Sequence, residues 1–131
     1  MRFIPTRFHG ILDYIVGIFM IIAPWVLDFS DNDAATWTMV IAGALVLLQT
    51  IMTDFEVGLI RRIPMRRHLT MDFILGLALA VSPWLLNFDE RVHMPHLILG
   101  VFSILASLTT HRVPSHSYKA THTAPDHIRN L

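Results

Sequence analysis

Four long apolar runs dominate this chain of 131 residues and limit what it can fold into: residues 9–28, 36–53, 69–87 and 95–111. Each run is apolar nearly all round, without the one-sided stripe that is typical of a helix on a soluble protein. At about 1.5 Å per residue, roughly 18–20 helical residues reach about 27–30 Å, close to the thickness of the hydrocarbon core of a bilayer. The runs therefore predict four transmembrane helices, of which the last is the shortest.

The composition supports a membrane protein over a soluble bundle. Hydrophobic residues make up 53% of the chain and charged residues 15%, against about 45–50% and about 25% in an ordinary soluble domain. A zero net charge gives no basic field to attract nucleic acid, and the absence of cysteine excludes thiolate metal sites. The first run resembles a signal peptide, but it is long for one and no A-x-A site follows it. We therefore expect a retained helix.

The basic residues predict the orientation of the chain in the membrane. Nine of the ten Lys and Arg residues precede the first run, lie between the second and third runs, or follow the fourth, and Arg91 alone lies in an outer loop. By the positive-inside rule, the basic side is cytoplasmic, which places both termini inside the cell and the protein in the inner membrane. The loop between the second and third runs contributes most to this signal and can also contact anionic headgroups, through Arg61, Arg62, Arg66 and Arg67.

The chain contains an internal repeat. A shift of 59 residues places the segment 23–29 (APWVLDF) on 82–88 (SPWLLNF), and it pairs His9 with His68, Asp13 with Asp72 and Gly17 with Gly76. After the outer loop the shift becomes 57, which pairs Gly43 with Gly100 and Thr53 with Thr110. Because each unit crosses the membrane twice, both copies should point the same way, related by a pseudo-twofold axis along the membrane normal. The predicted fold class is an all-α, four-helix transmembrane bundle made of two parallel two-helix repeats.

The repeated segments resemble the SPW repeat family of small prokaryotic integral membrane proteins, over about residues 8–111. Ser82, Pro83 and Trp84 match the motif that names the family, and Ala23 replaces the serine in the first copy. The resemblance implies two-helix units in a membrane, and it brings no catalytic activity or cofactor with it. We divide the chain into a first hairpin repeat, a basic cytoplasmic loop, a second hairpin repeat and a polar, His-containing tail that we expect to be disordered: 1–57, 58–67, 68–111 and 112–131.

The Pro-Trp pairs lie at the predicted outer ends of the first and third helices, where they should change the direction of the chain. Pro24 and Pro83 lack an N–H group, so each helix must kink or end there. We expect the chain to continue outward past a kink, with Trp25 and Trp84 at the headgroup level and Phe29 and Phe88 in the same aromatic belt. A paired pocket for a lipid or a quinone-like molecule at the two kinks is the alternative.

Two His-x-x-x-Asp pairs give the candidate functional residues. His9 with Asp13, and His68 with Asp72, each lie one helical turn apart near the cytoplasmic ends of the first and third helices. Ionisable side chains at membrane depth normally face the bundle interior and find a partner. We expect the repeat to bring both pairs together, as a structural polar clasp, as a ligand site that includes His111 and binds a transition metal or haem iron, or as a site that handles protons or ions.

No phosphate loop, nucleophile elbow or HExxH motif occurs, and no catalytic residue is predicted. Gln49, a single polar residue deep in the second run, should bond a neighbouring helix. The leading interpretation is a structural or accessory protein of the lipid bilayer that self-associates or joins a larger membrane complex. The alternative is a redox protein, or one that handles ions or protons, built on the paired His and Asp residues.

Overall fold

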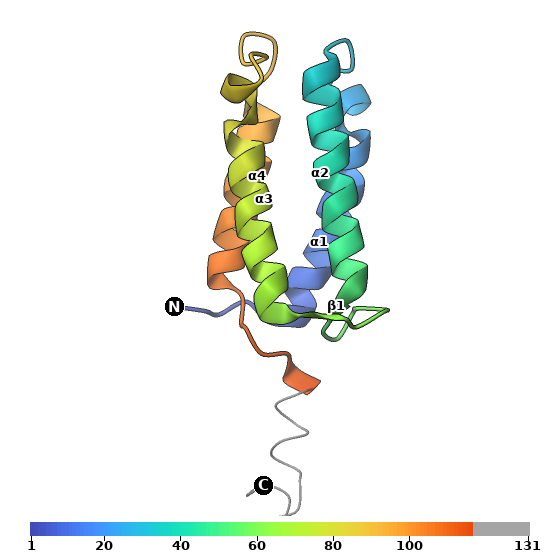
Figure 1. Cartoon of the computed structure of the whole chain (residues 1–131), viewed down its shortest axis with the longest axis vertical. Coiled ribbons are helices and arrows are strands. Elements are labelled where there is room, and N and C mark those ends of the chain that lie inside the picture. Colours follow the sequence, from blue (N-terminus) through green and yellow to red (C-terminus); the bar gives the residue numbers. More distant parts are fainter. Residues whose placement is uncertain (117–131) are drawn as a thin grey trace, which may run out of the picture.

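A computed structural model describes residues 1–116 of the chain, and it is an all-α bundle of four helices, as the sequence predicts. The helices follow one another as two hairpins, and each hairpin starts and finishes at the same end of the bundle (Figure 1). Their bounds are Thr6–Val26 (α1), Asp33–Met52 (α2), Met65–Leu85 (α3) and Met94–Thr109 (α4). The helices begin up to four residues before the predicted runs. The polar residues of their first turns do not belong to an apolar run, so the hydropathy pattern misses them.

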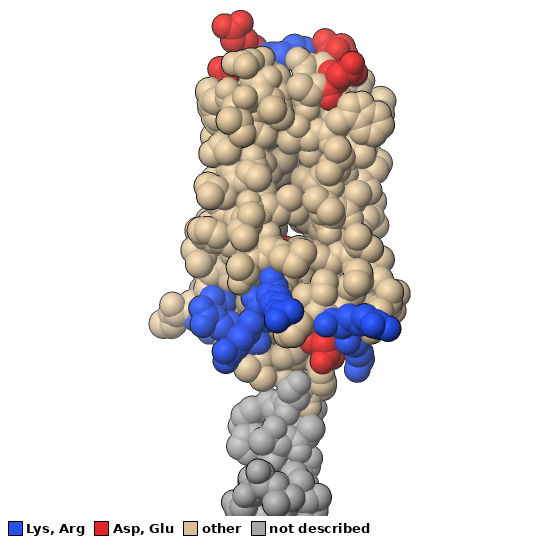
Figure 2. Space-filling model, viewed as in Figure 1, with Lys and Arg blue, Asp and Glu red and all other residues tan. Residues whose placement is uncertain are grey.

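Helices α1, α2 and α3 are long and apolar enough to cross a membrane, and α4 is a shorter apolar helix of 16 residues. On the face shown in Figure 2, charged residues lie mainly at the two ends of the bundle, and the long side between them is covered by uncharged residues. Large apolar side chains such as Ile15, Ile18 and Ile74 are more than half exposed. Such a surface is stable in lipid and costly in water, so the protein is a small membrane protein.

Each hairpin is closed by glycine contacts between its two helices. A Cβ atom added at Gly43 would lie 2.8 Å from the carbonyl oxygen of Gly17, and one added at Gly100 would lie 2.5 Å from the carbonyl oxygen of Gly76. Small residues let membrane helices approach this closely and gain dispersion contacts along their length. The two hairpins thus use equivalent residues for the same packing.

The two hairpins are joined at the basic end by short parallel pairings. The two-residue strands Thr53–Asp54 (β1) and Ile63–Pro64 (β2) pair with each other, and Ile4 forms a matching bridge with Thr110. In both places an isoleucine that precedes one hairpin pairs with a threonine that follows the other. The corresponding residues of the two repeats therefore make corresponding contacts, while the pseudo-twofold axis along the membrane normal stays a prediction.

The motif that contains Pro-Trp ends α1 and α3 by the same hydrogen bonds. The prolines lie inside the last turn, and each helix stops at a residue with a left-handed backbone, Asp28 or Asn87, each with φ 56°. The next residue donates its N–H back to the proline carbonyl, from Phe29 at 2.9 Å and from Phe88 at 2.8 Å. This is the Schellman pattern of helix termination, which uses a left-handed residue followed by an apolar one.

Phe29 and Phe88 correct one sequence expectation. Both rings are buried in the core rather than placed in an aromatic belt, and both pack on the ring of His96, with centroids 5.5 and 4.8 Å away. The reason is the Schellman ending, which turns its apolar residue back onto the helix. Trp25 and Trp84 do lie on the surface, 60% and 50% exposed.

Candidate functional site

A cluster of two histidines and two aspartates lies inside the bundle, toward its basic end. Helix α1 supplies His9 and Asp13, and helix α3 supplies His68 and Asp72 at the equivalent positions of its first turns. The two histidines and Asp72 are almost fully buried, and the Asp13 side chain is 13% exposed. We call these four residues the His–Asp cluster. The sequence predicted this meeting of the two pairs from the repeat alone.

The four facing atoms of the cluster lie at nearly equal distances. His9 Nε2 is 3.0 Å from Asp72 Oδ2 and 3.3 Å from Asp13 Oδ2. His68 Nε2 is 3.0 Å from Asp13 Oδ2 and 3.1 Å from Asp72 Oδ2. Each imidazole therefore faces both carboxylates through one nitrogen, and each carboxylate faces both imidazoles through one oxygen. The shortest contact of each histidine is to the aspartate of the other helix, so the cluster crosses between the hairpins.

One threonine hydroxyl contacts the far side of each histidine ring. Thr53 Oγ1 lies 2.8 Å from His68 Nδ1, and Thr110 Oγ1 lies 2.9 Å from His9 Nδ1. Each hydroxyl also donates to the carbonyl four residues earlier, at 2.6 Å for Thr53 and 2.7 Å for Thr110. A hydroxyl has one hydrogen to give, so it must accept the Nδ1–H of the histidine. Both rings thus carry a proton on Nδ1 and turn Nε2 toward the carboxylates.

Helix α2 supplies further polar contacts to the cluster. The amide nitrogen of Gln49 donates to Asp72 Oδ1, the oxygen that does not face the histidines. Thr50 Oγ1 lies 3.4 Å from Asp13 Oδ2. The sequence expectation that Gln49 bonds a neighbouring helix is confirmed, and the bond fixes the orientation of the Asp72 carboxylate. Beside the cluster, His9, Asp13 and Asp72 line a cavity of about 20 Å³, which is room for about one water molecule.

Sequence reasoning did not assign roles to Thr53 and Thr110. Their equivalence in the two repeats was visible, but neither lies one turn from a histidine along its own helix. Each threonine contacts the histidine of the other hairpin. It does so because the segment that follows each hairpin pairs with the segment that precedes the other, as Thr53 with Ile63 and Ile4 with Thr110. The signal that could have identified them is that both threonines occupy the same position in the two repeats.

The other candidates of the sequence lie apart from the cluster. His111 is exposed just beyond α4, and its backbone N–H donates to the carbonyl of Ile4 at 3.0 Å. At the acidic end of the bundle, His93 bonds the Asp89 carbonyl, whereas His96 is buried and bonds the Ala35 carbonyl. The tail histidines His122 and His127 lie outside the described residues.

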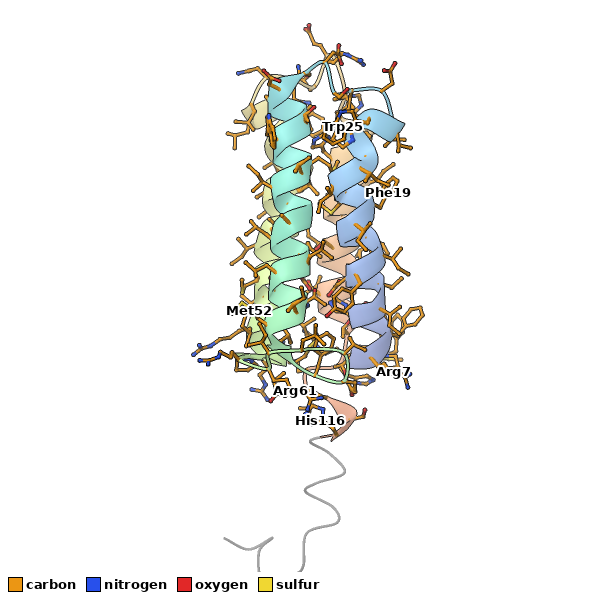
Figure 3. All side chains as sticks on the ribbon, turned by 90° about the vertical axis from the view of Figure 1, so that its right-hand side faces the viewer. Arg7, Phe19, Trp25, Met52, Arg61 and His116 are labelled. Atoms are coloured by element: carbon orange, nitrogen blue, oxygen red, sulfur yellow. The ribbon has the colours of Figure 1, made fainter. Side chains whose placement is uncertain are left out.

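The predicted lipid-facing residues lie at opposite ends of the bundle. Figure 3 shows Arg7 and Arg61 at one end and Trp25 at the other. Arg61, Arg62, Arg66 and Arg67 are all exposed at the basic end, as a headgroup contact requires. Ser82 is buried and donates to the Leu79 carbonyl at 2.7 Å. Because this bond stays within α3, Ala23 can replace the serine in the first copy without leaving a partner unsatisfied.

Comparison with known proteins agrees with the repeated motif. The SPW repeat domain model matches residues 7–110. The chain belongs to the SPW repeat domain family. No curated protein and no solved structure matches it. In this SPW repeat protein, the family match spans all four helices and the whole His–Asp cluster.

Proposed function

We propose that this SPW repeat protein is a small inner-membrane metal-binding protein whose His–Asp cluster holds one divalent transition-metal ion. The observation that carries the proposal is the closed set of four contacts, 3.0–3.3 Å long, between two Nε2 and two Oδ2 atoms. In a tetrahedral zinc site with bonds of about 2.0–2.1 Å, neighbouring ligand atoms lie about 3.3 Å apart. The four nitrogen–oxygen separations are therefore close to those between neighbouring ligands, and all four ligand atoms lie within 4.8 Å of one another.

The hydrogen bonds around the cluster support a metal over a simple ion pair. A metal-binding imidazole is oriented by a hydrogen bond from its other nitrogen, and Thr53 and Thr110 accept those bonds from His68 and His9. Each Nε2 forms a hydrogen bond to the aspartate of the other helix and also lies within 3.3 Å of an oxygen of its own helix's aspartate. A single ion at the centre satisfies all four atoms at once.

A divalent ion satisfies charge balance at this depth, as two protonated imidazoles would also do. Two carboxylates and two neutral imidazoles carry two negative charges in total, so a divalent cation makes the centre neutral. Neutrality matters because an uncompensated charge in a membrane bundle is costly. Nitrogen and oxygen ligands without thiolate suit Zn²⁺ and its neighbours among the divalent transition metals. We favour a bare ion over haem iron here, because carboxylate oxygens lie within 3.3 Å of both Nε2 atoms.

The metal content of the purified chain tests this proposal. The full chain in mild detergent, incubated with Zn²⁺ and desalted, should retain about one zinc per chain by elemental analysis. His68→Ala and Asp72→Asn should each lose most of it, since each removes a ligand. His111→Ala is the matched control, because His111 lies outside the cluster, and it should retain the metal. Equal zinc in wild type and His68→Ala would contradict the proposal, as would a wild type that holds none.

A structural clasp is the second candidate, and a separate observation favours it. The cluster, the two threonines and Gln49 form continuous hydrogen bonds across both hairpins. If the cluster serves only as a clasp, the double variant Asp13→Asn and Asp72→Asn should loosen the bundle to the same extent with and without Zn²⁺. If it binds metal, Zn²⁺ should raise the unfolding temperature of the wild type and leave that of the double variant unchanged.

We also propose that α4 crosses the membrane with the other helices, with the basic end of the bundle in the cytoplasm. Support comes from the close packing of α4 along α3 at Gly76 and Gly100, and from the concentration of Lys and Arg at one end, to which Arg91 is the exception. Sixteen helical residues span about 24 Å, which local thinning of the bilayer can accommodate. Self-association and membership of a larger complex stay predictions of the sequence, and native mass spectrometry of detergent extracts measures both.

A further inference from the structure

A groove of about 490 Å³ lies on the α3–α4 hairpin at the basic end of the bundle. Three separate segments contribute an arginine to it: Arg2 from the N-terminal arm, Arg66 from the first turn of α3 and Arg112 from the segment after α4. The remaining lining is mostly apolar and comes from the two helices, with Leu69, Phe73 and Leu108 as its apolar members. None of these residues belongs to the His–Asp cluster.

The three guanidinium groups lack a negative partner among residues 1–116, where no carboxylate forms an ion pair with any of them. Arg2 is held in place, because its Nη1 donates to the Ser107 carbonyl at 2.9 Å and also to the Thr110 carbonyl. Partial burial and the nearby positive charge of Arg112 lower the pKa of Arg2. The groove thus concentrates positive charge that an anion would relieve.

The position of the groove indicates what kind of anion it accepts. Arg66 lies where α3 begins and Arg112 just after α4 ends, so the arginines lie at the headgroup level of a membrane around the bundle. Phe73 lies seven residues further along α3, roughly 10 Å deeper by helical rise. Phe73 and Leu108 are both partly exposed, so the groove continues into an apolar surface open to lipid tails.

We propose that this groove binds an anionic phospholipid, with the headgroup phosphate among Arg2, Arg66 and Arg112 and an acyl chain along Phe73 and Leu108. Guanidinium groups bind phosphate oxygens through paired hydrogen bonds. A zwitterionic headgroup fits less well, because its cationic end would enter a rim of three arginines. A free phosphate ion would use the rim but not the apolar surface.

Lipid retention by the full chain tests this proposal. The protein in mild detergent is mixed with equal amounts of phosphatidylglycerol and phosphatidylcholine, and native mass spectrometry measures the lipid that stays bound. We expect one phosphatidylglycerol per chain in preference to phosphatidylcholine. The double variant Arg66→Gln with Arg112→Gln should weaken the retention at least roughly tenfold, since juxtamembrane arginines each contribute several-fold to binding anionic lipid. Arg66→Lys with Arg112→Lys keeps the charge but loses the paired hydrogen bonds, so it should bind more weakly than the wild type and more tightly than the double Gln variant.

Arg67→Gln is the matched control, because Arg67 neighbours Arg66 but does not line the groove. It should bind phosphatidylglycerol as the wild type does. An equal loss in this control would show general charge attraction and overturn the proposal, as would equal retention of the two lipids by the wild type. Displacement of the lipid by inorganic phosphate at the same concentration would assign the rim to a soluble anion and also overturn it. Circular dichroism of each variant checks that the helices remain.

Discussion

Thr110 shows how single residues outside the His–Asp cluster determine the geometry of the cluster. Its hydroxyl accepts from His9 Nδ1 and donates to the Ala106 carbonyl, so it fixes both the proton and the angle of the imidazole. Thr53 does the same for His68 from the opposite hairpin. Since both rings are held from behind, the two Nε2 atoms face the carboxylates before any ion binds.

The substitution Thr110→Val tests this orienting role. Valine has nearly the shape of threonine but cannot accept the Nδ1–H of His9, so zinc affinity should fall about 10–100-fold while the helix content is kept. Thr109→Val is the matched control, because Thr109 is half-buried and its side chain bonds only within α4. Competition with a chelator of known affinity measures the change. Unchanged affinity in Thr110→Val, or an equal drop in Thr109→Val, would show that the hydroxyl has no orienting role.

Glu56 is a second residue with a defined electrostatic role, outside the membrane-spanning helices. Partial burial opposes its ionisation, but hydrogen bonds from Ser115 and from Thr6, the latter at 2.6 Å, outweigh it and lower the pKa of Glu56 to about 2. Glu56 thus links the loop after α2 to the start of α1 and to the chain beyond α4. A carboxylate with a lowered folded-state pKa stabilises the fold when it is ionised.

The pH dependence of unfolding tests the contribution of Glu56. Because its folded pKa of about 2 lies below its usual value, the stabilisation is complete above about pH 4.5 and is lost as the pH falls toward about 2. Relative to Glu56→Gln, the wild type should be more stable at neutral pH by about 1 kcal/mol or less, since the group is partly screened by solvent. Thermal unfolding in detergent measures it. A difference between the two proteins that does not shrink between pH 4.5 and pH 2 would contradict this account.

The sequence predicted part of the site at the residue scale. The repetition of His and Asp one turn apart was enough to predict that His9, Asp13, His68 and Asp72 lie together, as they do. The crossed pairing, in which each histidine lies closest to the aspartate of the other helix, depends on the distance between α1 and α3. The spacing of residues along the chain does not give that distance. For the same reason, the sequence did not assign a role to Thr53 and Thr110.

Among the helices, glycine contacts set how closely each hairpin closes. An alanine Cβ at Gly100 would lie 2.5 Å from the Gly76 carbonyl oxygen and 2.6 Å from the Ala80 nitrogen. These are backbone atoms that cannot turn away as a side chain could. The pair α3 and α4 would have to separate, which moves the end of α4, and with it Thr110, relative to the cluster.

Gly100→Ala should therefore destabilise the bundle by about 1–3 kcal/mol, as overpacking of a tight contact does. The control is Leu105→Ala on the same helix, where the leucine is more than half exposed to the surroundings, and it should change little. Thermal unfolding monitored by circular dichroism in detergent compares the two. Gly100→Ala that is as stable as wild type would show that the helix contact is looser than the structure has it.

Helix positions were predictable from the sequence, and helix endings were predicted less well. The long apolar runs located all four helices, since each run lies on one helix of the structure. The sequence also identified Pro24 and Pro83 as the sites of a change in direction. It did not predict that Phe29 and Phe88 turn inward, because that depends on the left-handed residues Asp28 and Asn87, whose conformation residue type alone does not fix.

Viewed as a whole, the molecule is two hairpins held together at their two ends and at the His–Asp cluster. At the acidic end Arg91 bonds both carboxylate oxygens of Asp31, at 2.8 and 3.1 Å. At the basic end the bridges of Ile63 with Thr53 and of Ile4 with Thr110 tie the chain ends. A metal ion at the cluster would add a strong connection between the two hairpins inside the bundle.

The orientation of this molecule in the membrane can be tested by single cysteines, because the chain has none of its own. Glu90→Cys lies at the acidic end and Leu59→Cys at the basic end, and both positions are exposed. A maleimide that does not cross membranes should label Glu90→Cys in cells with an opened outer membrane, and Leu59→Cys only after the inner membrane is permeabilised. The reverse pattern would contradict the proposed topology.

The coordination of zinc bound to the purified protein tests the central claim most directly. X-ray absorption at the zinc edge should show two imidazole nitrogens and two carboxylate oxygens at roughly 2.0–2.1 Å, in tetrahedral geometry and without sulfur. In His68→Ala the imidazole signal should fall by about half, or the zinc should be lost altogether. A shell of water oxygens without imidazole, or a spectrum unchanged in His68→Ala, would contradict the assignment of the His–Asp cluster as a metal site.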